Sequence, residues 1–400
     1  MKNLNLKLAV YEDLNSLDRL RPAWEDLLAS YPAASIFSTW EWLAPWWRAF
    51  GGGQQLLVLA FFDGDKLAAL APLSIGTQRG PGGIKLRVLR LMGDGSQDSD
   101  NLDLPVRPGY EEAFVDALLG YLKTRRSLWD LAELNTLPSN SLLGGVLPQN
   151  LAKRKWTYCI RRCPCSAVAL PATWQAYVSN LSSEDRNNLT RYGRRLEKRY
   201  QVRMYKCTEE GKLPAYLDVL FELHQKRWRL RNEPGSFGSL ARRQFYNEMA
   251  RCFLAKDWLE LWVMELNQRI VAVQYAFRYD STVYQLQEGF EPDHSPDRIG
   301  FILRGHVLQH LIEQGVRVYD FLGGESPSKA RWGAQVGNYI DIHFARPYTL
   351  GAAYLRLRSG AHEGKEWFRA HLPGSAWSAL HWLNLHLRGA SPHKGAASED

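Results

Sequence analysis

Two charged residues near the end of a predicted strand are the first candidates for chemistry in this chain. Lys329 follows Asp320 and the glycine turn Gly323-Gly324, where the chain should emerge into a cleft. An ammonium group there can stabilise a developing oxyanion without titrating, or it can pair with Glu325 as a solvated lysine. Asp320 either faces a substrate or caps the following turn through its side chain. We predict catalytic roles for Lys329 and Asp320.

A histidine supplies a third catalytic candidate, because its ordinary pKa suits a general base. His224 lies on the predicted helix Leu213–Arg229, with Phe221 and Trp228 at three- and four-residue spacing. This spacing is typical of the face of a helix that packs in a core. It favours a buried histidine that holds Arg227 and Trp228 in place. We keep His224 as a catalytic candidate, and Arg227 and Trp228 as substrate-binding candidates.

A glycine stands at the start of the helix predicted over residues 300–314. A helix N-terminus offers unpaired N–H groups and positive potential, which attract phosphate groups. Gly300 would let a phosphate approach closely, and Arg298 adds positive charge. We therefore expect Arg298, Ile299, Gly300 and Phe301 to bind the phosphates of a donor. The alternative is that Gly300 serves close packing of the helix on a sheet.

Positive charge is concentrated in one part of the chain. The formal net charge is +8, yet residues 153–231 alone hold 18 Lys and Arg against 7 Asp and Glu. Within them, the predicted helix Leu181–Tyr200, capped by Ser182, carries Arg191 and Arg195, which we expect to bind an anionic substrate. Small phosphorylated ligands rank above nucleic acid, because the segment lacks the regular aromatic interleaving of a single-strand binder. For most of these side chains, a solvated helix face is the alternative.

Acidic residues also gather in the first part of the chain. Asp100 and Asp103 belong to a glycine-containing loop, Asp94–Asp103. They either face the amine or sugar hydroxyls of an acceptor, or only keep the loop soluble. The sequence holds no Gly-x-Ser-x-Gly elbow and no convincing Cys/His pair, so we expect direct attack on the donor without an acyl-enzyme.

The cysteines do not predict a metal site. There are five, and Cys163 and Cys165 are separated by one residue, whereas zinc and redox motifs have two. No histidine-rich partner lies near them. Small side chains on a strand are the expected role, and we assign no metal.

The elements that would position these residues occur twice, about 190 to 200 residues apart. In this alignment Asp130 matches Asp320, which favours a structural role for both. The first copy comprises the hairpin Leu56–Ile75, strand Lys85–Met92, helix Tyr110–Arg125 and strand Trp129–Leu134; the second comprises the hairpin Leu259–Tyr279, strand Thr282–Phe290, helix Gly300–Gln314 and strand Val316–Leu322. Other predicted elements are the strand Leu6–Tyr11, the helices Leu14–Ser30, Phe37–Phe50, Thr173–Leu181 and Leu240–Ala255, the loop Glu291–Arg298, and the strands Trp156–Arg162 and Tyr339–Arg346.

Two similar domains of a mixed α/β (α+β) class follow from this repeat, since 400 residues exceed one compact core. We expect domains over residues 1–170 and 171–350, with a ligand in the cleft between them. Residues 351–400 form a helical tail, in which Trp377 and Leu380 begin an amphipathic pattern that docks on the body or lies on a membrane surface. Residues 391–400 should be disordered.

A soluble, cytoplasmic protein is expected, with the tail as its one route to a membrane surface. The first residues do not form the apolar run of a signal peptide. No stretch approaches the roughly 20 apolar residues that cross a bilayer.

A set of motifs in the second copy resembles a known family. The set comprises His224-x-x-Arg227-Trp228, Gly289-Phe290-Glu291-Pro292 before Ile299-Gly300, Gly315-x-x-x-Tyr319-Asp320-Phe321-Leu322-Gly323-Gly324-Glu325, Lys329 and Trp332. Together these resemble the GNAT-superfamily acyltransferases of the cellulose-biosynthesis (CelD-type) group, relatives of the Fem-type aminoacyl transferases. The resemblance covers roughly residues 5–346 and is strongest over 220–335.

The resemblance implies two tandem GNAT-like domains, each a mixed sheet flanked by helices. It implies transfer of an acyl group, with acyl-CoA such as acetyl-CoA as co-substrate, to an amine or hydroxyl in envelope or exopolysaccharide pathways. Lys329 matches the lysine that contacts the transferred carbonyl or a phosphate in Fem-type relatives. Two alternatives stay open, namely a tRNA-dependent aminoacyl transferase and a catalytically inactive scaffold or regulator of polysaccharide synthesis.

Overall fold

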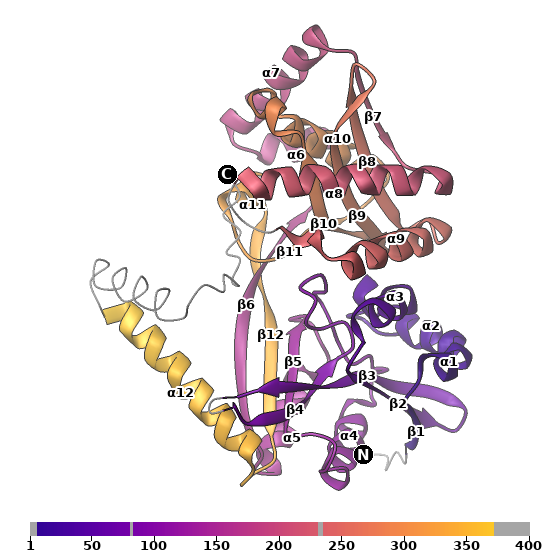
Figure 1. Ribbon diagram of the computed structural model, residues 1–400, viewed down its shortest axis with the longest axis vertical. Helices are drawn as coiled ribbons and strands as arrows, with labels where there is room; N and C mark the ends of the chain where they lie inside the picture. Colours follow the sequence, from indigo (N-terminus) through magenta and orange to yellow (C-terminus); the bar gives the residue numbers. More distant parts are fainter. Residues whose placement is uncertain (1–5, 81–82, 231–234, 372–400) are drawn as a thin grey trace.

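One mixed sheet runs the full length of the molecule (Figure 1). The structure, a computed structural model, describes residues 6–80, 83–230 and 235–371. Within them the sheet has twelve strands in the order β1-β2-β3-β4-β5-β12-β6-β11-β10-β9-β8-β7. The strands are β1 (Lys7–Tyr11), β2 (Gln55–Asp63), β3 (Lys66–Arg79), β4 (Lys85–Leu91), β5 (Leu131–Leu137), β6 (Thr157–Ala169), β7 (Val202–Lys206), β8 (Leu259–Leu266), β9 (Arg269–Tyr279), β10 (Thr282–Phe290), β11 (Val318–Gly323) and β12 (Gln335–Ala345).

Helices cover both faces of this sheet (Figure 1). The α-helices are α1 (Leu14–Leu17), α2 (Arg21–Ala29), α3 (Trp40–Phe50), α4 (Glu111–Thr124), α5 (Leu143–Lys153), α6 (Trp174–Asn180), α7 (Ser183–Arg199), α8 (Leu213–Leu230), α9 (Leu240–Ala255), α10 (Ile299–Glu313), α11 (Pro327–Ala330) and α12 (Leu350–His371). We call β1 to β5 with α1 to α5 the first half, and β7 to β11 with α6 to α11 the second half.

The two halves share one topology, as the sequence repeat predicts. The order β2-β3-β4-β5 in the first half matches β8-β9-β10-β11 in the second. In each half only the last two of these strands are parallel, and they are joined through α4 or α10. Parallel neighbours need such a helical crossover. The prediction of two tandem GNAT-like α/β units is therefore confirmed.

The two halves exchange their last strands. β6 follows β5 and α5 in the chain but pairs with β11 of the second half, whereas β12 follows α11 and pairs with β5 of the first. β6 and β12 also pair with each other over eleven residue pairs. Figure 1 shows them as two long strands that join the halves. The domain boundary near residue 170 stays a prediction, since the sheet continues across it.

The register of the parallel strands corrects one equivalence that the sequence alignment suggested. In each half the parallel pairing spans three residue pairs, and the last pair ends on Glu133 in β5 and on Asp320 in β11. Glu133, and not Asp130, is therefore the counterpart of Asp320. Asp130 instead pairs with the Arg87 guanidinium at 2.7 Å and binds the Arg87 backbone N–H.

Two α-helices and one strand were not predicted, and one predicted loop is helical. The missed elements are α5, β7 and α11. α5 contains Gly144, Gly145 and Pro148, which are poor helix formers, so packing on α4 rather than local propensity explains it. Residues Pro292–Asp297, predicted as loop, form a 3₁₀-helix before α10.

Aromatic side chains join the two halves on one face of the sheet. Trp42 of α3 is fully buried, and its ring lies 5.3 Å from Phe245 of α9 and 5.3 Å from Phe277 of β9. Phe37, just before α3, meets Tyr284 of β10 at 5.4 Å. The tryptophan-dense helix α3 thus packs against α9, and these contacts hold the halves in a fixed orientation.

The first part of the tail helix docks on the body. Ala352 and Leu355 of α12 are buried against Leu86 and Val88 of β4. An alanine at Gly351 would place its Cβ 1.8 Å from the main-chain oxygen of Asp130, so this contact is tight. The predicted amphipathic pattern from Trp377 and the segment 391–400 lie outside the described residues. Along the described chain, no helix combines the length and apolar character needed to cross a bilayer.

Phe344→Ala should lower the free energy of unfolding by about 3–5 kcal/mol, because it empties a core position of the exchanged strand β12. The Phe344 side chain is 1% exposed and lies 5.8 Å from the Trp129 ring. Urea denaturation measures this cost. Val336→Ala, at a 57% exposed position of β12, is the matched control and should cost less than about 0.5 kcal/mol. Separate transitions for the two halves in the wild type would contradict their coupling through β12.

Candidate functional site

Carboxylates from both halves meet at the end of β11. Asp320 accepts a hydrogen bond from the backbone N–H of Leu322 at 2.7 Å, so it caps the turn that follows its strand. Asp100, on the loop of the first half, accepts one from the backbone N–H of Gly323 at 2.8 Å. The structure therefore brings together two carboxylates that the sequence placed more than two hundred residues apart.

The amide of Asn101 links Asp320 to a buried phenol. The side chain of Asn101 donates to Asp320 at 3.5 Å and to the Tyr339 hydroxyl at 3.1 Å. Tyr339 lies on the exchanged strand β12 and is 3% exposed. Burial, with Asp100 and Asp320 nearby, holds the pKa of Tyr339 well above its usual range, so it stays a neutral donor and acceptor. Sequence reasoning missed Asn101 and Tyr339, and only the position of Asn101 next to Asp100 gave a signal.

Lys329 lies beside these carboxylates. It belongs to α11, whose N-cap Ser326 accepts a hydrogen bond from the Lys329 backbone N–H at 3.3 Å. Its ammonium group donates to the main-chain oxygens of Gly323 at 2.7 Å and Gly324 at 3.2 Å. Burial raises the pKa of both Asp100 and Asp320, and the Lys329 charge opposes this rise. Three of the predicted residues, Lys329, Asp320 and Asp100, thus form one cluster, which we call the carboxylate–lysine cluster.

The electrostatics of this cluster suit proton transfer near neutral pH. Burial is the main cause that raises the pKa of Asp320 to about 6, against the opposing effects of the Leu322 N–H and Lys329. Burial also raises the pKa of Asp100, while the Gly323 N–H and Lys329 oppose the rise. A carboxylate with a pKa near the working pH is suited to act as a general base.

A buried salt bridge fixes the loop that carries Asp100. Asp98 accepts from the Arg242 guanidinium of α9 at 3.1 Å and from the Tyr246 hydroxyl at 2.9 Å. The Asp98 side chain is only 2% exposed. Because a buried charge must be paired, this contact ties the loop of the first half to the second half. Sequence reasoning missed Arg242 and Tyr246 as partners of Asp98.

Asp103 lies away from the cluster, inside the first half. It is 3% exposed and accepts hydrogen bonds from the Tyr31 hydroxyl, from Ser141 Oγ at 2.9 Å and from the Leu104 backbone N–H at 2.8 Å. Burial raises the pKa of Asp103 to about 6. These contacts anchor the end of the loop. A substrate-binding role for Asp103 stays a prediction.

His224 is buried and neutral. Its Nε2 accepts a hydrogen bond from Trp228 Nε1 at 2.8 Å, and the imidazole is 1% exposed. Burial, reinforced by Arg227 and Arg242, lowers the pKa of His224 to about 3. Arg227 lies 4.0 Å from Glu288 and 5.4 Å from the Phe290 ring. These contacts are those of a histidine that positions its neighbours, and the catalytic and substrate-binding roles of this trio stay predictions.

The predicted donor site at the start of α10 adjoins the basic helix α7. Asp297, just before α10, is bound by Arg199 at 2.6 Å and Arg195 at 3.6 Å. Arg298 is exposed and adopts a left-handed conformation at the N-cap, with no side-chain cap on the helix. The first turn of α10 contains no acidic residue. Arg298 and Arg195 are therefore brought together around one helix N-terminus.

The other residues predicted at the start of α10 have packing roles. Ile299 is buried, and a Cβ at Gly300 would lie 3.2 Å from the Phe290 ring, so close packing explains this glycine. The Phe301 ring lies 4.7 Å from Trp332, and the Arg331 guanidinium lies over Phe301 at 5.6 Å. Their roles in donor binding stay predictions.

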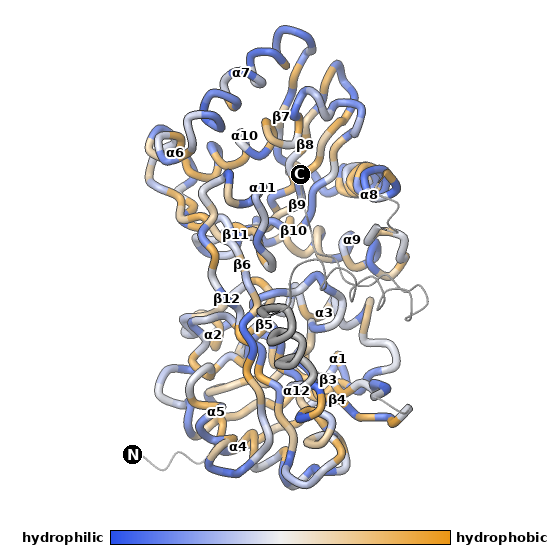
Figure 2. The backbone as a smooth tube through the Cα atoms, turned by 90° about the vertical axis from the view of Figure 1, so that its left-hand side faces the viewer, coloured by the Kyte–Doolittle hydropathy of each residue, from blue (hydrophilic) through white to orange (hydrophobic). Residues whose placement is uncertain are grey.

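A groove of about 630 Å³ follows the outer face of α7. Figure 2 shows α7 as largely hydrophilic. Arg191 is exposed there, bonded to Asn188 at 2.7 Å and stacked on Tyr192 at 4.7 Å. The groove is lined by Asn187, Thr190, Arg191, Arg194, Arg195, Lys198 and Arg199. Such a row of cations attracts phosphate groups.

Helix α11 connects the carboxylate–lysine cluster to this basic region. Arg331, two residues after Lys329, binds Asp185 in the first turn of α7 at 3.0 Å. The same guanidinium lies over Phe301 of α10. A donor whose phosphates lie at α7 and α10 would therefore have the carboxylate–lysine cluster close by.

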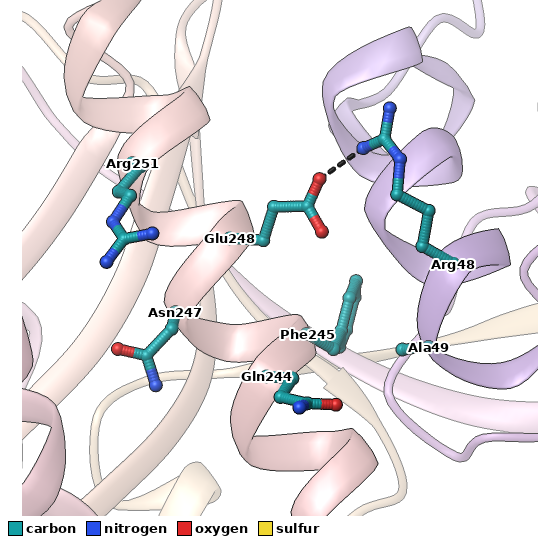
Figure 3. Close-up of a pocket in the computed structure, with 7 residues that line it drawn as sticks. All are labelled: Arg48, Ala49, Gln244, Phe245, Asn247, Glu248 and Arg251. Atoms are coloured by element: carbon teal, nitrogen blue, oxygen red, sulfur yellow. Dashed lines mark hydrogen bonds and ion pairs between the residues drawn. The ribbon is translucent and has the colours of Figure 1, made fainter. Parts of the chain in front are cut away.

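A second pocket, of about 610 Å³, lies between the halves at α3 and α9 (Figure 3). Arg48 of α3 pairs with Glu248 of α9 across it. Both side chains are at least one-third exposed, so the pair contributes at most about 1 kcal/mol. None of the predicted site residues lines this pocket. Along the described chain, no group of His, Cys, Asp and Glu side chains is arranged to hold a metal ion.

The first half lacks the matching donor features. Its crossover helix α4 carries Glu111 and Glu112 in the first turn, which repel an anion at that N-terminus. Glu133, the counterpart of Asp320, is bound by Arg90 at 2.8 Å and by Arg358 of α12. The tail helix α12 therefore covers Glu133, the position in the first half that corresponds to the predicted catalytic residue Asp320.

Comparison with known proteins supports the fold and the class. Residues 183–330 match the family model described as an acetyltransferase (GNAT) domain. No curated protein matches the chain. Its fold is similar to the crystal structure of FemX, with 10% identity, a TM-score of 0.59, and coverage of 87% of this chain and 99% of FemX.

A second solved structure is similar over most of its length. It is the C-terminal domain of a putative lysylphosphatidylglycerol synthetase from Agrobacterium fabrum, with 12% identity, a TM-score of 0.50, and coverage of 86% of this chain and 96% of that one. At such low identity these likenesses show the fold alone. Together with the family match, the findings support a GNAT-type acetyltransferase domain over residues 183–330 and an acyltransferase enzyme.

Proposed function

We propose that this protein transfers an acyl group from acyl-CoA directly to an amine or hydroxyl of an envelope or exopolysaccharide precursor, as a member of the CelD-type group. The observation that carries the proposal is the carboxylate–lysine cluster, formed where Asp320 and Lys329 of the second half meet Asp100 of the first. A base and a fixed cation beside a basic helix N-terminus are the parts that acyl transfer requires.

The donor phosphates bind at the start of α10 and along α7. Arg298 and Arg191 are exposed there, and Arg195 reaches the loop before α10. The acyl thioester then extends along α11 to Lys329. Only the second half offers this arrangement, because α4 begins with two glutamates. We therefore assign donor binding to residues 171–350 and acceptor binding chiefly to residues 1–170.

In the transfer step Asp320 accepts the proton of the acceptor amine or hydroxyl. The freed nitrogen or oxygen attacks the thioester carbonyl, and Lys329 stabilises the oxyanion that forms. Collapse of this intermediate breaks the carbon–sulfur bond. The proton held by Asp320 then passes to the thiolate of CoA, which restores the carboxylate. Because acyl-CoA is found inside cells, the proposal places the reaction in the cytoplasm.

A tRNA-dependent aminoacyl transfer is the second candidate. The cations of α7 extend from Arg191 to Lys198, about 10 Å along the helix, which is longer than one diphosphate needs. The likeness of the fold to FemX agrees with a Fem-type relative. Loss of activity on RNase treatment would favour this candidate over acyl-CoA. No contact of the carboxylate–lysine cluster supports the third alternative, an inactive scaffold.

Asp320→Asn should lower kcat/KM by about 10²–10⁴, because it removes the general base. In the wild type kcat/KM should rise with pH through about 6, since the raised pKa keeps Asp320 protonated below that value. Thiol release from acetyl-CoA, with glucosamine as a test acceptor, measures both. Asp130→Asn is the matched control and should leave the profile unchanged. Persistence of the low-pH limb in Asp320→Asn would exclude Asp320 as the base.

Lys329→Ala should lower turnover by about 10²–10³, as the loss of an oxyanion donor does. The free energy of unfolding should fall by about 1 kcal/mol, because the contacts to the Gly323 and Gly324 carbonyls are also lost. Chemical rescue separates the two effects, and added methylammonium should restore part of the turnover. Turnover at the wild-type level in this variant would remove Lys329 from the site.

The double change Arg191→Gln and Arg195→Gln should weaken CoA binding at least tenfold, because it removes two cations of the donor site. Isothermal titration with CoA measures this. Arg203→Gln, an exposed arginine on β7, is the matched control and should change the affinity less than twofold. If Arg203→Gln weakened CoA binding as much as the double change does, the net charge of the protein, and not a site at α7, would explain the effect.

A further inference from the structure

A polar row runs from the carboxylate–lysine cluster across the exchanged strands. Residues directly opposite each other in antiparallel strands share a face. Asp320 of β11 lies opposite Ala167 of β6, and Arg161 of β6 lies opposite Asp341 of β12. Residues 161 and 167 are an even number apart, so Arg161 and Asp320 face the same side of the sheet.

From Thr157 to Cys165, side chains of this face of β6 are half-buried, whereas those of its other face are exposed. Arg161, Cys163 and Cys165 belong to the half-buried set, and Arg162 and Pro164 to the exposed set. The chain between Arg161 and Ala167 rises about 20 Å along the strand. Between them on this face, β6 contributes only Cys163 and Cys165, and β12 contributes Tyr339 opposite Cys163. We call this strip, from Asp320 to Arg161, the β6 floor.

Two buried hydrogen-bond donors at the far end of the floor lack partners. Nη2 of Arg161 and Oγ1 of Thr136 are both buried, and neither has a hydrogen-bond partner among the described residues. They lie on either side of Asp341, since Arg161 is its cross-strand neighbour and Thr136 donates its backbone N–H to it at 2.8 Å. Leaving such groups unpaired is costly, more so for a charged group.

Among the described residues, Asp341 forms no ion pair with Arg161. Asp341 is occupied by the Thr136 N–H on one oxygen and by the Cys163 thiol on the other, at 3.2 Å. Within the described residues, Nη2 of Arg161 has no hydrogen-bond partner. Burial and Asp341 raise the pKa of the Cys163 thiol to about 12, and Arg161 opposes this rise.

We infer that Arg161 and Thr136 bind an oxyanion group, a phosphate or a carboxylate, of an extended acceptor that lies along the β6 floor. A guanidinium and a hydroxyl both donate, which an oxyanion requires. The acceptor then carries its anionic group about 20 Å from the amine or hydroxyl that reacts at Asp320. This inference rests on the proposed function, because it names the acceptor of that reaction.

The test is the binding of inorganic pyrophosphate and of malonate, measured by isothermal titration. The starting protein carries Arg191→Gln and Arg195→Gln, so that the α7 site does not contribute. Adding Arg161→Gln should lower the affinity for at least one of the two anions tenfold or more. Adding Thr136→Val should lower the affinity for the same anion severalfold. Arg162→Gln, the neighbouring residue on the opposite face of β6, is the matched control and should change neither affinity more than twofold.

Each outcome decides the inference. If pyrophosphate binding depends on Arg161, the acceptor carries a phosphate group. If malonate binding depends on Arg161, the acceptor carries a carboxylate group. Arg161→Lys keeps the charge and should retain most of the binding, which excludes a loss caused by misfolding. Equal effects of Arg161→Gln and Arg162→Gln, or none, would overturn the inference. Failure of CoA to bind the wild-type protein would instead refute the proposed donor and leave this site standing.

Discussion

The pairing of β6 with β12 is the constraint on which the rest of the structure depends. Each strand leaves the half that precedes it in the chain and pairs with the other, so the two sheets become one. The site follows from this exchange. Tyr339 enters it from β12, Asp100 and Asn101 lie on the loop of the first half, and Asp320 lies in β11 of the second.

Backbone groups support the half-buried side chains of the carboxylate–lysine cluster. The end of β11 has Leu322 at a φ of +62°, and the turn after it has Gly324 at +84°. This geometry directs two N–H groups at Asp320 and Asp100. The carbonyls of the same turn receive the Lys329 ammonium. One short segment therefore stabilises both signs of charge, which a functional site needs before any substrate binds.

Much of the fold and part of the site follow from local sequence. Apolar alternation and turn residues predicted both hairpins, and the Ser182 cap predicted α7. The strand exchange could not be predicted, because β6 and β12 carry no signal of which partner they choose. For the same reason sequence reasoning grouped Lys329 with Asp320 but missed Asn101, Tyr339 and Arg161. The counterpart of Asp320 was misassigned, because strand register depends on which residues pair and not on the residue types of a motif.

The most direct test of the account is a crystal structure of the protein with desulfo-coenzyme A. The account predicts that the diphosphate lies against the first turn of α10, within hydrogen-bond distance of Arg298 or of an arginine of α7. The pantetheine arm should then end beside Lys329 and Asp320. Coenzyme density at the start of α4 in the first half, or in the pocket between α3 and α9, would contradict the assignment of the donor site and of the reaction centre.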